Sequence, residues 1–407
     1  MLDGLTTSAA VAAPRVWIVA EAVGEPSEPW LWRQITGLRR IRPHVVCWRH
    51  TNEAAYPLCN IPRTVLPFQP HPFEGTGRWM YRLRNLPNWN FFASVGSERR
   101  FLCELARRTR PQVILAHFGH FALRVEPIAR QFGIPLVTHF HGMDISSMLR
   151  NKWYRASLLA ALPAFAAIIV VGSHQRGWLL AQGVPADRIH LIPCGVPVQE
   201  YTPARRDASA GPRFLCVSRL VEFKGVDVSI QAFAIAAREL PEAELVIIGG
   251  GTDRAWLEKL ARDSGVGGRV RFLGDLPSTE ARAWFQSSDV FLQHSMNGSN
   301  GWVEGFGVSI AEAASSGLPV IVTECGGIPD QVVNQETGLI VPQGDVQAMS
   351  DAMLRLARDA ALRSRMGRAG RQRAVACFDA RRQIERLEDV LLSVVENNAY
   401  ASIPAHN

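Results

Sequence analysis

Two glutamates, Glu304 and Glu312, stand out in the stretch EGFGVSIAEAASSGLPVIVTECGGIPD, where a Gly-Phe-Gly turn precedes a short helical pattern. A buried carboxylate is costly without a partner and glycines are costly in conformational entropy, so their combination indicates a ligand site. The predicted helix runs from Val308 to Ser316, and the backbone N–H groups around its N-terminus can donate to a phosphate or to sugar hydroxyls. These N–H groups belong to Gly305, Phe306, Gly307 and Val308. A capped helix with a buried ion pair is the alternative.

A second set of reactive side chains follows the predicted strand RFLCVS. Arg219 and Lys224 lie in the loop SRLVEFKGVD. The chain has only three lysines against 41 arginines. A lysine retained beside a glycine therefore indicates a position where a compact charge meets a phosphate. A solvated surface pair between Lys224 and Glu222 is the alternative.

Histidines follow two predicted strands in the first half of the chain. AHFGH contains His117 and His120, and THFHGMDIS contains His139, His141 and Asp144. Histidine and carboxylate groups can ligate zinc, so a metal site is one interpretation. The glycines after each motif are more typical of strand-end loops that line a cleft. A core position is a further alternative for His139.

Strand and helix patterns alternate along the chain and would position these loops. β-Branched runs such as VILAHF, PLVTHF, ELVIIG and PVIVT alternate with amphipathic segments such as 226–239 and 253–264. This alternation occurs twice, which predicts an α/β fold of two Rossmann-like, doubly wound domains that face each other across a deep cleft. We expect the first domain at 14–196 and the second at 212–379, with a helix at about 380–398 packing back on the first.

Composition fits a folded two-domain protein. The 407 residues are 47% hydrophobic and 20% charged, which excludes a disordered chain. Seven scattered cysteines without a CxxC pattern favour reduced thiols over a disulfide framework or a zinc site. The start, MLDGLTTSAAVAAP, does not resemble a signal peptide, and no apolar run approaches the ~20 residues of a membrane span. We therefore expect a cytoplasmic protein that is not integral to a membrane.

Positive charge is concentrated in residues 1–200, which contain 22 Lys and Arg against 12 Asp and Glu. This balance indicates an anionic partner, such as nucleic acid, a phosphorylated substrate or an acidic membrane surface. The segment GRWMYRLRNLPNWNFF, residues 77–92, mixes aromatic residues with arginines and predicts contact with the anionic inner-membrane surface. Packing of these aromatic side chains inside the first domain is the alternative. No nucleic-acid-binding motif accompanies the charge, so we expect no nucleic-acid partner.

The second half of the chain resembles the retaining GT-B glycosyltransferases of family 4. EGFGVSIAEAASSGLPVIVTECGGIPD is similar to the E-x7-E signature of that family, and SRLVEFKGVDVSIQAFA to its phosphate-binding loop. VRFLGDLPSTEARAWFQSSDVFLQHS is similar to its base-binding region. In the first half, PSEPWLWRQITGL, AHFG and HFHGMDIS resemble the branch that builds bacterial exopolysaccharides such as colanic acid and amylovoran.

The resemblance implies a role for each donor-side position. Glu304 would contact hydroxyls of the donor sugar, Glu312 the ribose of the nucleotide, and His141 the sugar near its anomeric carbon. Arg219 and Lys224 would neutralise the diphosphate leaving group, together with the amides of the Gly-Phe-Gly turn.

The resemblance also assigns the base and the acceptor. The region around Leu276 would hold the base, and Ser27, Glu28 and His117 would lie on the acceptor side. The chain departs from many family members there, because AEAVGEPSEP stands in place of a Gly-Gly loop.

The function implied is a retaining, metal-independent hexosyltransferase that moves a sugar from a nucleotide-sugar donor to a lipid-linked oligosaccharide in bacterial polysaccharide biosynthesis. The chain has no DxD pair to hold a divalent ion, so we expect no metal and no cofactor, with cationic side chains stabilising the leaving group. The alternatives are a nucleotide-sugar epimerase or a phosphorylase on the same fold, and a non-catalytic nucleotide-binding protein.

Overall fold

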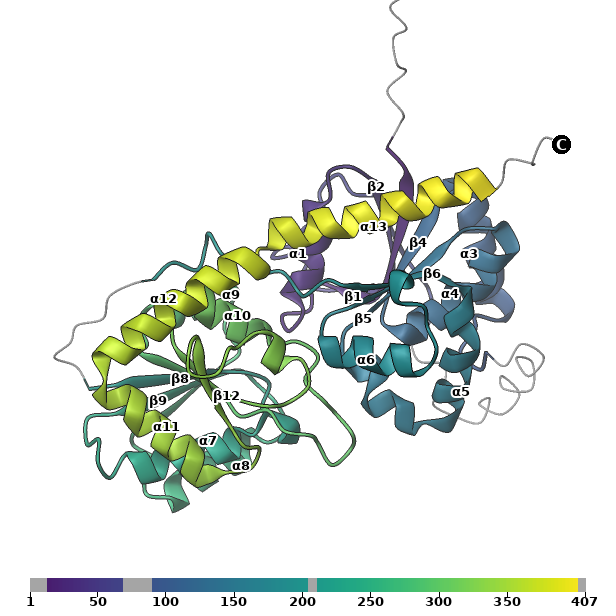
Figure 1. Cartoon of the computed structure of the whole chain (residues 1–407). Helices are drawn as coiled ribbons and strands as arrows, with labels where there is room; N and C mark the ends of the chain where they lie inside the picture. Colours follow the sequence, from purple (N-terminus) through teal and green to yellow (C-terminus); the bar gives the residue numbers. More distant parts are fainter. Residues whose placement is uncertain (1–12, 69–89, 204–210, 402–407) are drawn as a thin grey trace, which may run out of the picture.

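The computed structural model describes residues 13–68, 90–203 and 211–401. It contains two parallel β-sheets, each with its own helices, which form two Rossmann-like domains side by side (Figure 1). The prediction of two doubly wound α/β domains is therefore confirmed.

The first domain is built on a seven-stranded sheet with the order β3-β2-β1-β4-β5-β6-β7. Its strands are β1 (Arg15–Val23), β2 (Arg42–His50), β3 (Arg63–Val65), β4 (Val113–His117), β5 (Leu136–Phe140), β6 (Phe165–Val170) and β7 (Ile189–Leu191). Its helices are α1 (Pro29–Gly37), α3 (Gly96–Thr109), α4 (Gly119–Phe132), α5 (Lys152–Ala161) and α6 (Ser173–Ala181). The strand order reverses between β1 and β4, and ligands bind at such a switch point in open parallel sheets.

The second domain is built on a six-stranded sheet with the order β10-β9-β8-β11-β12-β13, which reverses between β8 and β11. Its strands are β8 (Arg213–Val217), β9 (Glu244–Ile248), β10 (Val270–Gly274), β11 (Val290–Gln293), β12 (Val320–Thr323) and β13 (Gly338–Val341). Its helices are α7 (Val226–Ala236), α8 (Arg254–Asp263), α9 (Ser278–Gln286), α10 (Val308–Ser315), α11 (Val346–Arg358) and α12 (Ala360–Cys377).

The last helix, α13 (Ala380–Ala401), lies on the first domain although it follows the second in sequence (Figure 1). It packs against α1, β4 and β6. Its apolar face, which includes the fully buried Leu387 and Leu391, joins the core of the first sheet. Where the chain returns, the N–H of Val196 donates to the carbonyl of Phe378 at 2.8 Å, and the N–H of Ala380 donates to that of Val196 at 2.9 Å.

The segment predicted to meet a membrane falls mostly outside the described residues, which exclude 69–89. Phe91 and Phe92 are described, and they are only 1% and 8% exposed. Their rings lie edge-on to Trp153 and Tyr154, with centroids 4.8 and 5.4 Å apart. These two side chains therefore pack in the first domain, as the alternative interpretation held. None of the helices in the described ranges combines the length and apolar character needed to cross a bilayer.

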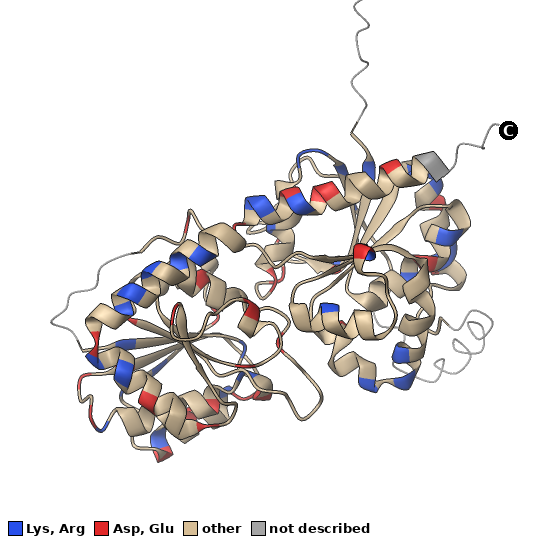
Figure 2. Cartoon of the chain, in the orientation of Figure 1, with Lys and Arg blue, Asp and Glu red and all other residues tan. Residues whose placement is uncertain are grey.

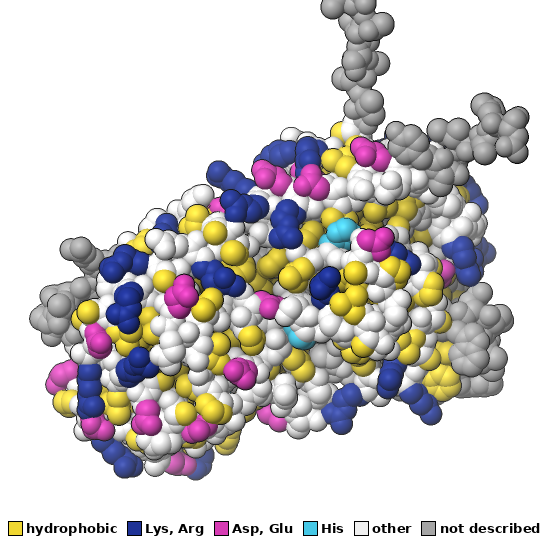
Figure 3. Space-filling view, viewed as in Figure 1, with side chains coloured by type: hydrophobic (Ala, Val, Ile, Leu, Met, Phe, Trp, Pro, Cys, Tyr) yellow, Lys and Arg dark blue, Asp and Glu magenta, His cyan; other side chains and the backbone are white. Residues whose placement is uncertain are grey.

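Positive charge also extends to the second domain. Helix α12 contains five arginines and no acidic residue, and Figure 2 shows them spaced along the helix. On the face drawn in Figure 3, basic side chains lie over α12 and the beginning of α13. A basic surface is therefore not confined to the first half of the chain.

Candidate active site

The loops at the carboxyl ends of both sheets enclose one cavity of about 490 Å³ between the domains. The first domain contributes residues after β1, β4 and β5, and the second contributes residues after β8 and β10 and the segment before α10. The sequence-predicted residues that line it are Ser27, Glu28, His141, Arg219, Lys224, Leu276, Glu304, Gly305, Phe306, Val308 and Glu312. Residues that are far apart in sequence thus meet at the two switch points, where ligands bind in such folds.

Glu304 lies at the centre of a polar cluster on the second-domain wall. It is 7% exposed, and its Oε2 forms an ion pair with the ammonium of Lys224. The same oxygen accepts hydrogen bonds from Gln293 Nε2 at 2.9 Å and from Ser295 Oγ at 3.1 Å. Three donors to one oxygen fix the carboxylate, and its Oε1 carries no hydrogen bond to the residues the structure describes.

Lys224 does not form the surface pair with Glu222 that was the alternative interpretation. The carboxylate of Glu222 instead accepts from the N–H and hydroxyl of Ser299, at 3.2 and 2.7 Å. Arg219, from the same loop as Lys224, is exposed at the cavity wall. Both cations thus line the cavity. There an anionic ligand could pair with Arg219 and could replace Glu304 as the partner of Lys224.

Glu312 joins the two domains. Its Oε1 accepts from the hydroxyl of the buried Tyr201 at 2.8 Å and lies 3.8 Å from Arg33 Nη2 on α1 of the first domain. Burial raises the pKa of Glu312, and the charge of Arg33 and the hydrogen bond from Tyr201 oppose that rise. The carboxylate therefore lies at the seam of the cleft and at the edge of the cavity.

The turn before α10 offers fewer free amides than expected. Gly305, Phe306 and Val308 line the cavity, but Gly307 does not. The side-chain amide of Gln331 accepts from the N–H of Gly307 at 2.9 Å and donates to its carbonyl at 3.0 Å. The Gly307 amide is consequently occupied within the fold, which removes it from the predicted donor-binding groups.

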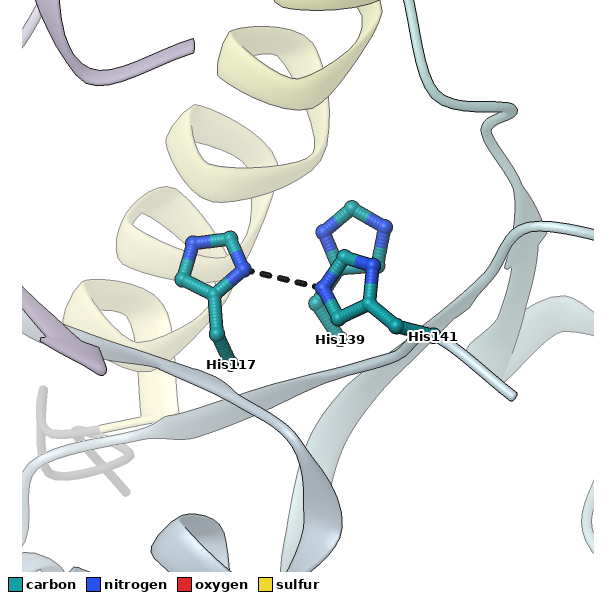
Figure 4. A group of neighbouring side chains, drawn as sticks. All are labelled: His117, His139 and His141. Carbon is teal, nitrogen blue, oxygen red and sulfur yellow. Dashed lines mark hydrogen bonds between the residues drawn. The ribbon is translucent and has the colours of Figure 1, made fainter. Parts of the chain in front are cut away.

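Three histidines at the ends of β4 and β5 lie together (Figure 4), and His141 lines the cavity. His117 Nδ1 and His141 Nε2 are 3.0 Å apart, so one donates to the other. The Trp30 ring packs on His141 with centroids 4.2 Å apart. Below the loop, Asp144 accepts from the N–H groups of His141 and Gly142 at 3.1 and 2.9 Å. These contacts fix the imidazole that faces the cavity.

His117 and His139 lie behind His141, and both are almost fully buried. His117 does not line the cavity, so its predicted place beside an acceptor is corrected to one behind the wall, where it supports His141. Register explains the position, because His117 pairs with His139 on the neighbouring strand. Burial lowers the pKa of His117 to about 3 and those of His139 and His141 well below the ordinary value, so all three are neutral.

The histidine trio has spacing that would admit a metal ion, since a ligand atom from each lies within 4.8 Å of the others. Neutral imidazoles are suitable ligands. However, His117 Nδ1 and His141 Nε2 already form a hydrogen bond with each other. The rings of His139 and His141 are also only 4.1 Å apart at a shallow angle of 36°, whereas ligands of one ion converge from different directions.

Carboxylates also line the first-domain side of the cavity. Glu21 pairs with Arg49 at 2.7 Å, and Glu25 accepts from the hydroxyl of Thr51 at 3.3 Å. The carboxylate of Glu28 has no hydrogen bond or ion pair to another residue in the described ranges. Burial, followed by repulsion from Glu21 and Glu25, raises the pKa of Glu28 to about 7, although Arg219 across the cleft and Arg49 lower it. Glu28 therefore changes charge near neutral pH.

Several contributors to the site were not predicted from the sequence. Gln293 and Ser295 belong to the run QHS at the end of β11, where polar residues after an apolar strand were an available signal. Trp30 lies in the PSEPWLW segment, whose aromatic residues follow the predicted loop. No sequence signal indicated Tyr201 or Arg33. The contact of Arg33 with Glu312 arises only when the domains meet, and Tyr201, which packs in the core of the second domain, is 111 positions from Glu312 in the chain.

Comparison with known proteins identifies the family. The family described as "Glycosyl transferases group 1" matches residues 200–373, and "Glycosyltransferase Family 4" matches residues 38–200. The amylovoran biosynthesis glycosyltransferase AmsK of Erwinia amylovora is 32% identical over 60% of this chain and 61% of its own length. A GDP-mannose-dependent alpha-(1-6)-phosphatidylinositol monomannoside mannosyltransferase of Mycolicibacterium smegmatis is 31% identical over 65% of this chain and 72% of its own.

Solved structures agree at the level of fold. The crystal structure of HepE from Anabaena in complex with UDP has a TM-score of 0.74 at 18% identity, covering 93% of this chain and all of that one. The sequence match spans 61% of AmsK, which is less than two thirds of its length. From the two family matches, the relatives and the shared architecture, the chain belongs to the family 4, group 1 glycosyltransferases of GT-B fold.

Proposed function

We propose that the protein is a retaining hexosyltransferase that moves a sugar from a nucleotide-sugar donor to a lipid-linked saccharide during bacterial polysaccharide synthesis. The observation that carries this proposal is the pairing of Glu304 with Lys224, beside Arg219 and opposite His141, in the cavity between the domains. The diphosphate of a bound donor would pair with Lys224 and Arg219. The carboxylate of Glu304, freed from Lys224, would then accept from sugar hydroxyls.

The reaction needs charge stabilisation more than a nucleophile. Cleaving the bond between sugar and diphosphate builds negative charge on the leaving group, which Arg219 and Lys224 would stabilise, and losing one such contact typically costs on the order of 10²–10³ in rate. Once Lys224 has turned to the diphosphate, Gln293 and Ser295 would still donate to one oxygen of Glu304, which suits hydroxyl binding better than attack on carbon. This arrangement supports front-face attack by the acceptor, with retention and without a metal ion.

His141 would support the sugar as a neutral group. Its low pKa means that the imidazole carries no charge at neutral pH, and His117 and Trp30 fix its ring. A neutral, oriented imidazole can hydrogen-bond to the sugar near the anomeric carbon without repelling the positive charge that develops there. Leu276, which lines the cavity after β10, would contact the base, and Ser27 and Glu28 the acceptor.

The test is to incubate the protein with a panel of nucleotide sugars and to measure release of nucleoside diphosphate, with Glu304→Gln as the matched inactive variant. The proposal predicts release with one donor class, and a product whose anomeric configuration matches that of the donor. Interconversion of the sugar without release would indicate an epimerase. Binding without either reaction would indicate a non-catalytic nucleotide-binding protein.

The acceptor would lie at the cytoplasmic face of the inner membrane, where lipid-linked saccharides are accessible to a peripheral enzyme. Two relatives support this part, since one is named for amylovoran biosynthesis and the other for a phosphatidylinositol mannoside. Basic residues near an acidic leaflet contribute about 1 kcal/mol each. Flotation with anionic liposomes at low salt should therefore recover the protein, while neutral liposomes or high salt should not. Equal recovery under all conditions would overturn the membrane proposal.

A further inference from the structure

The two cations proposed to meet the diphosphate share one aromatic ring. Lys224 Nζ lies 5.0 Å from the centroid of the Phe223 ring, and the guanidinium carbon of Arg219 lies 5.7 Å from the same centroid. The Trp302 ring stacks on Phe223 with centroids 5.2 Å apart and planes 14° apart. Arg219 also lies 5.5 Å from the Trp302 centroid. Arg219 is thus placed against both rings, and Lys224 against one.

Aromatic rings suit this position for a physical reason. Two cations held close together repel each other, and the negative face of a ring attracts both. The guanidinium of Arg219 makes no hydrogen bond and no ion pair within 4.0 Å to the residues the structure describes, so the two rings are its main support. A guanidinium that is already placed loses less conformational freedom when a ligand binds. The rings therefore arrange positive charge before an anion arrives.

The loop that carries Trp302 is fastened on both sides of the cleft. The N–H and hydroxyl of Ser299 donate to Glu222, which begins the short helix Glu222–Lys224. From the first domain, Arg150 Nη1 donates to the carbonyl of Ser299 at 2.6 Å. A Cβ on Gly301 would lie 2.9 Å from the Arg150 side chain. The loop therefore contacts the first domain closely, and its position depends on where that domain lies.

We propose that Phe223 and Trp302 form a platform that positions Arg219 and Lys224 for the diphosphate, and that Arg150 of the other domain holds the loop that completes this platform. Donor affinity is then coupled to the contact between the domains through Ser299. Phe223, Trp302 and Arg150 act as positioning residues. This inference rests on the proposed function, because it needs a diphosphate in the cavity.

The experiment measures the dissociation constants of three nucleoside diphosphates, UDP, GDP and ADP, for four proteins. The nucleoside that corresponds to the most tightly bound diphosphate is measured in the same way. The four proteins are the wild type, Trp302→Ala, Trp302→Phe and the control Trp256→Ala, whose side chain on α8 is 53% exposed. Trp302→Ala should weaken diphosphate binding about tenfold and leave nucleoside binding within twofold. Trp302→Phe should recover most of the loss, and Trp256→Ala should match the wild type.

A double-mutant cycle tests whether Trp302 affects diphosphate binding through Arg219. If Trp302 acts through Arg219, the Arg219→Ala/Trp302→Ala double variant should bind the diphosphate no more weakly than Arg219→Ala alone. Arg150→Ala should weaken diphosphate binding severalfold, with its thermal unfolding midpoint unchanged. Full additivity, or equal loss of nucleoside and diphosphate binding in Trp302→Ala, would overturn the inference. A wild type that binds no diphosphate would instead overturn the proposed function, and this inference with it.

Discussion

Gly142 and Gly305 bring the backbones of the two domains into contact beside the cavity. A Cβ on Gly142 would lie 3.0 Å from the Cα of Gly305, and a Cβ on Gly305 would lie 2.1 Å from the carbonyl oxygen of His141. Gly142 also has a φ of +130°, which residues other than glycine rarely adopt. The Gly-Phe-Gly turn before α10 can therefore approach His141 closely only because Gly142 and Gly305 have no side chains.

Gly305→Ala should push the domains apart, because the obstructing atom belongs to a backbone that cannot move alone. We expect diphosphate affinity to fall at least about tenfold and small-angle scattering to report a larger radius of gyration, while each domain stays folded. Gly177→Ala on α6 is the control, since a Cβ there has no neighbour within 4 Å. It should raise the free energy of unfolding by about 0.5–1 kcal/mol. Unchanged scattering and affinity in Gly305→Ala would contradict the prediction.

Glu304→Gln should lower turnover on the order of 10²–10³-fold, as loss of a polar contact at the reacting centre commonly does. The amide keeps the shape of the side chain but removes the charge that Lys224, Gln293 and Ser295 surround. Initial rates at saturating donor, with circular dichroism as a check of folding, measure the effect. Wild-type turnover with every donor tested would show that this carboxylate has no part in the reaction.

Glu312→Ala should weaken nucleotide binding and also lower the free energy of unfolding by about 1–3 kcal/mol, since Tyr201 and Arg33 lose their buried partner. Tyr201→Phe separates the two effects, because it removes only the hydrogen bond to Glu312. We expect this variant to lose about 1 kcal/mol of stability and to keep nucleotide affinity within twofold. Calorimetric titration measures the nucleotide affinity, and urea unfolding measures the stability. Equal nucleotide affinity in Glu312→Ala and wild type would refute the assignment of Glu312 to nucleotide binding.

Activity should survive excess EDTA, because Arg219 and Lys224 would supply the positive charge that a metal supplies elsewhere. The comparison is of initial rates with and without chelator, with metal content measured on the same sample. His139→Ala tests the trio directly, and it should leave the metal content unchanged. Loss of activity on chelation, restored by one divalent ion, would favour a metal at His117, His139 and His141.

Stability should depend on pH through Glu28. Its pKa is raised to about 7 in the folded protein, above the ordinary value of about 4.3 in the unfolded chain. The folded state therefore favours the neutral carboxyl. The contribution of Glu28 to the free energy of unfolding is fully present below pH 4 and is lost as the pH rises through 7. Between pH 5 and 8, Glu28→Gln should gain stability relative to wild type by on the order of 2 kcal/mol. A difference that does not vary with pH would contradict this.

The fold could be predicted from sequence because its signals are local. Strands such as VILAHF and ELVII are continuous apolar runs, as expected for strands buried on both faces. Most of the predicted site residues line the cavity, and Arg219, Lys224 and Glu304 could be predicted from local signals because they lie in loops that follow recognisable strands.

The remaining features of the site depend on contacts between residues that are far apart in sequence. The contacts of Glu312 with Tyr201 and Arg33 join residues more than a hundred positions apart and leave no local pattern. His117 and His141 each follow a strand and look equivalent in sequence. Only the register of β4 against β5 and the approach of Trp30 decide that His141 faces the cavity and His117 does not.

The return of α13 to the first domain has a consequence for biosynthesis. The ribosome produces β1 to β7 early, but one face of that sheet is covered by Leu387 and Leu391, which follow the entire second domain in the chain. Until they emerge, apolar residues of β1, β4 and β6 are exposed to solvent and to neighbouring nascent chains, which favours aggregation. The amino-terminal domain thus begins folding first and is completed only after the domain encoded downstream of it.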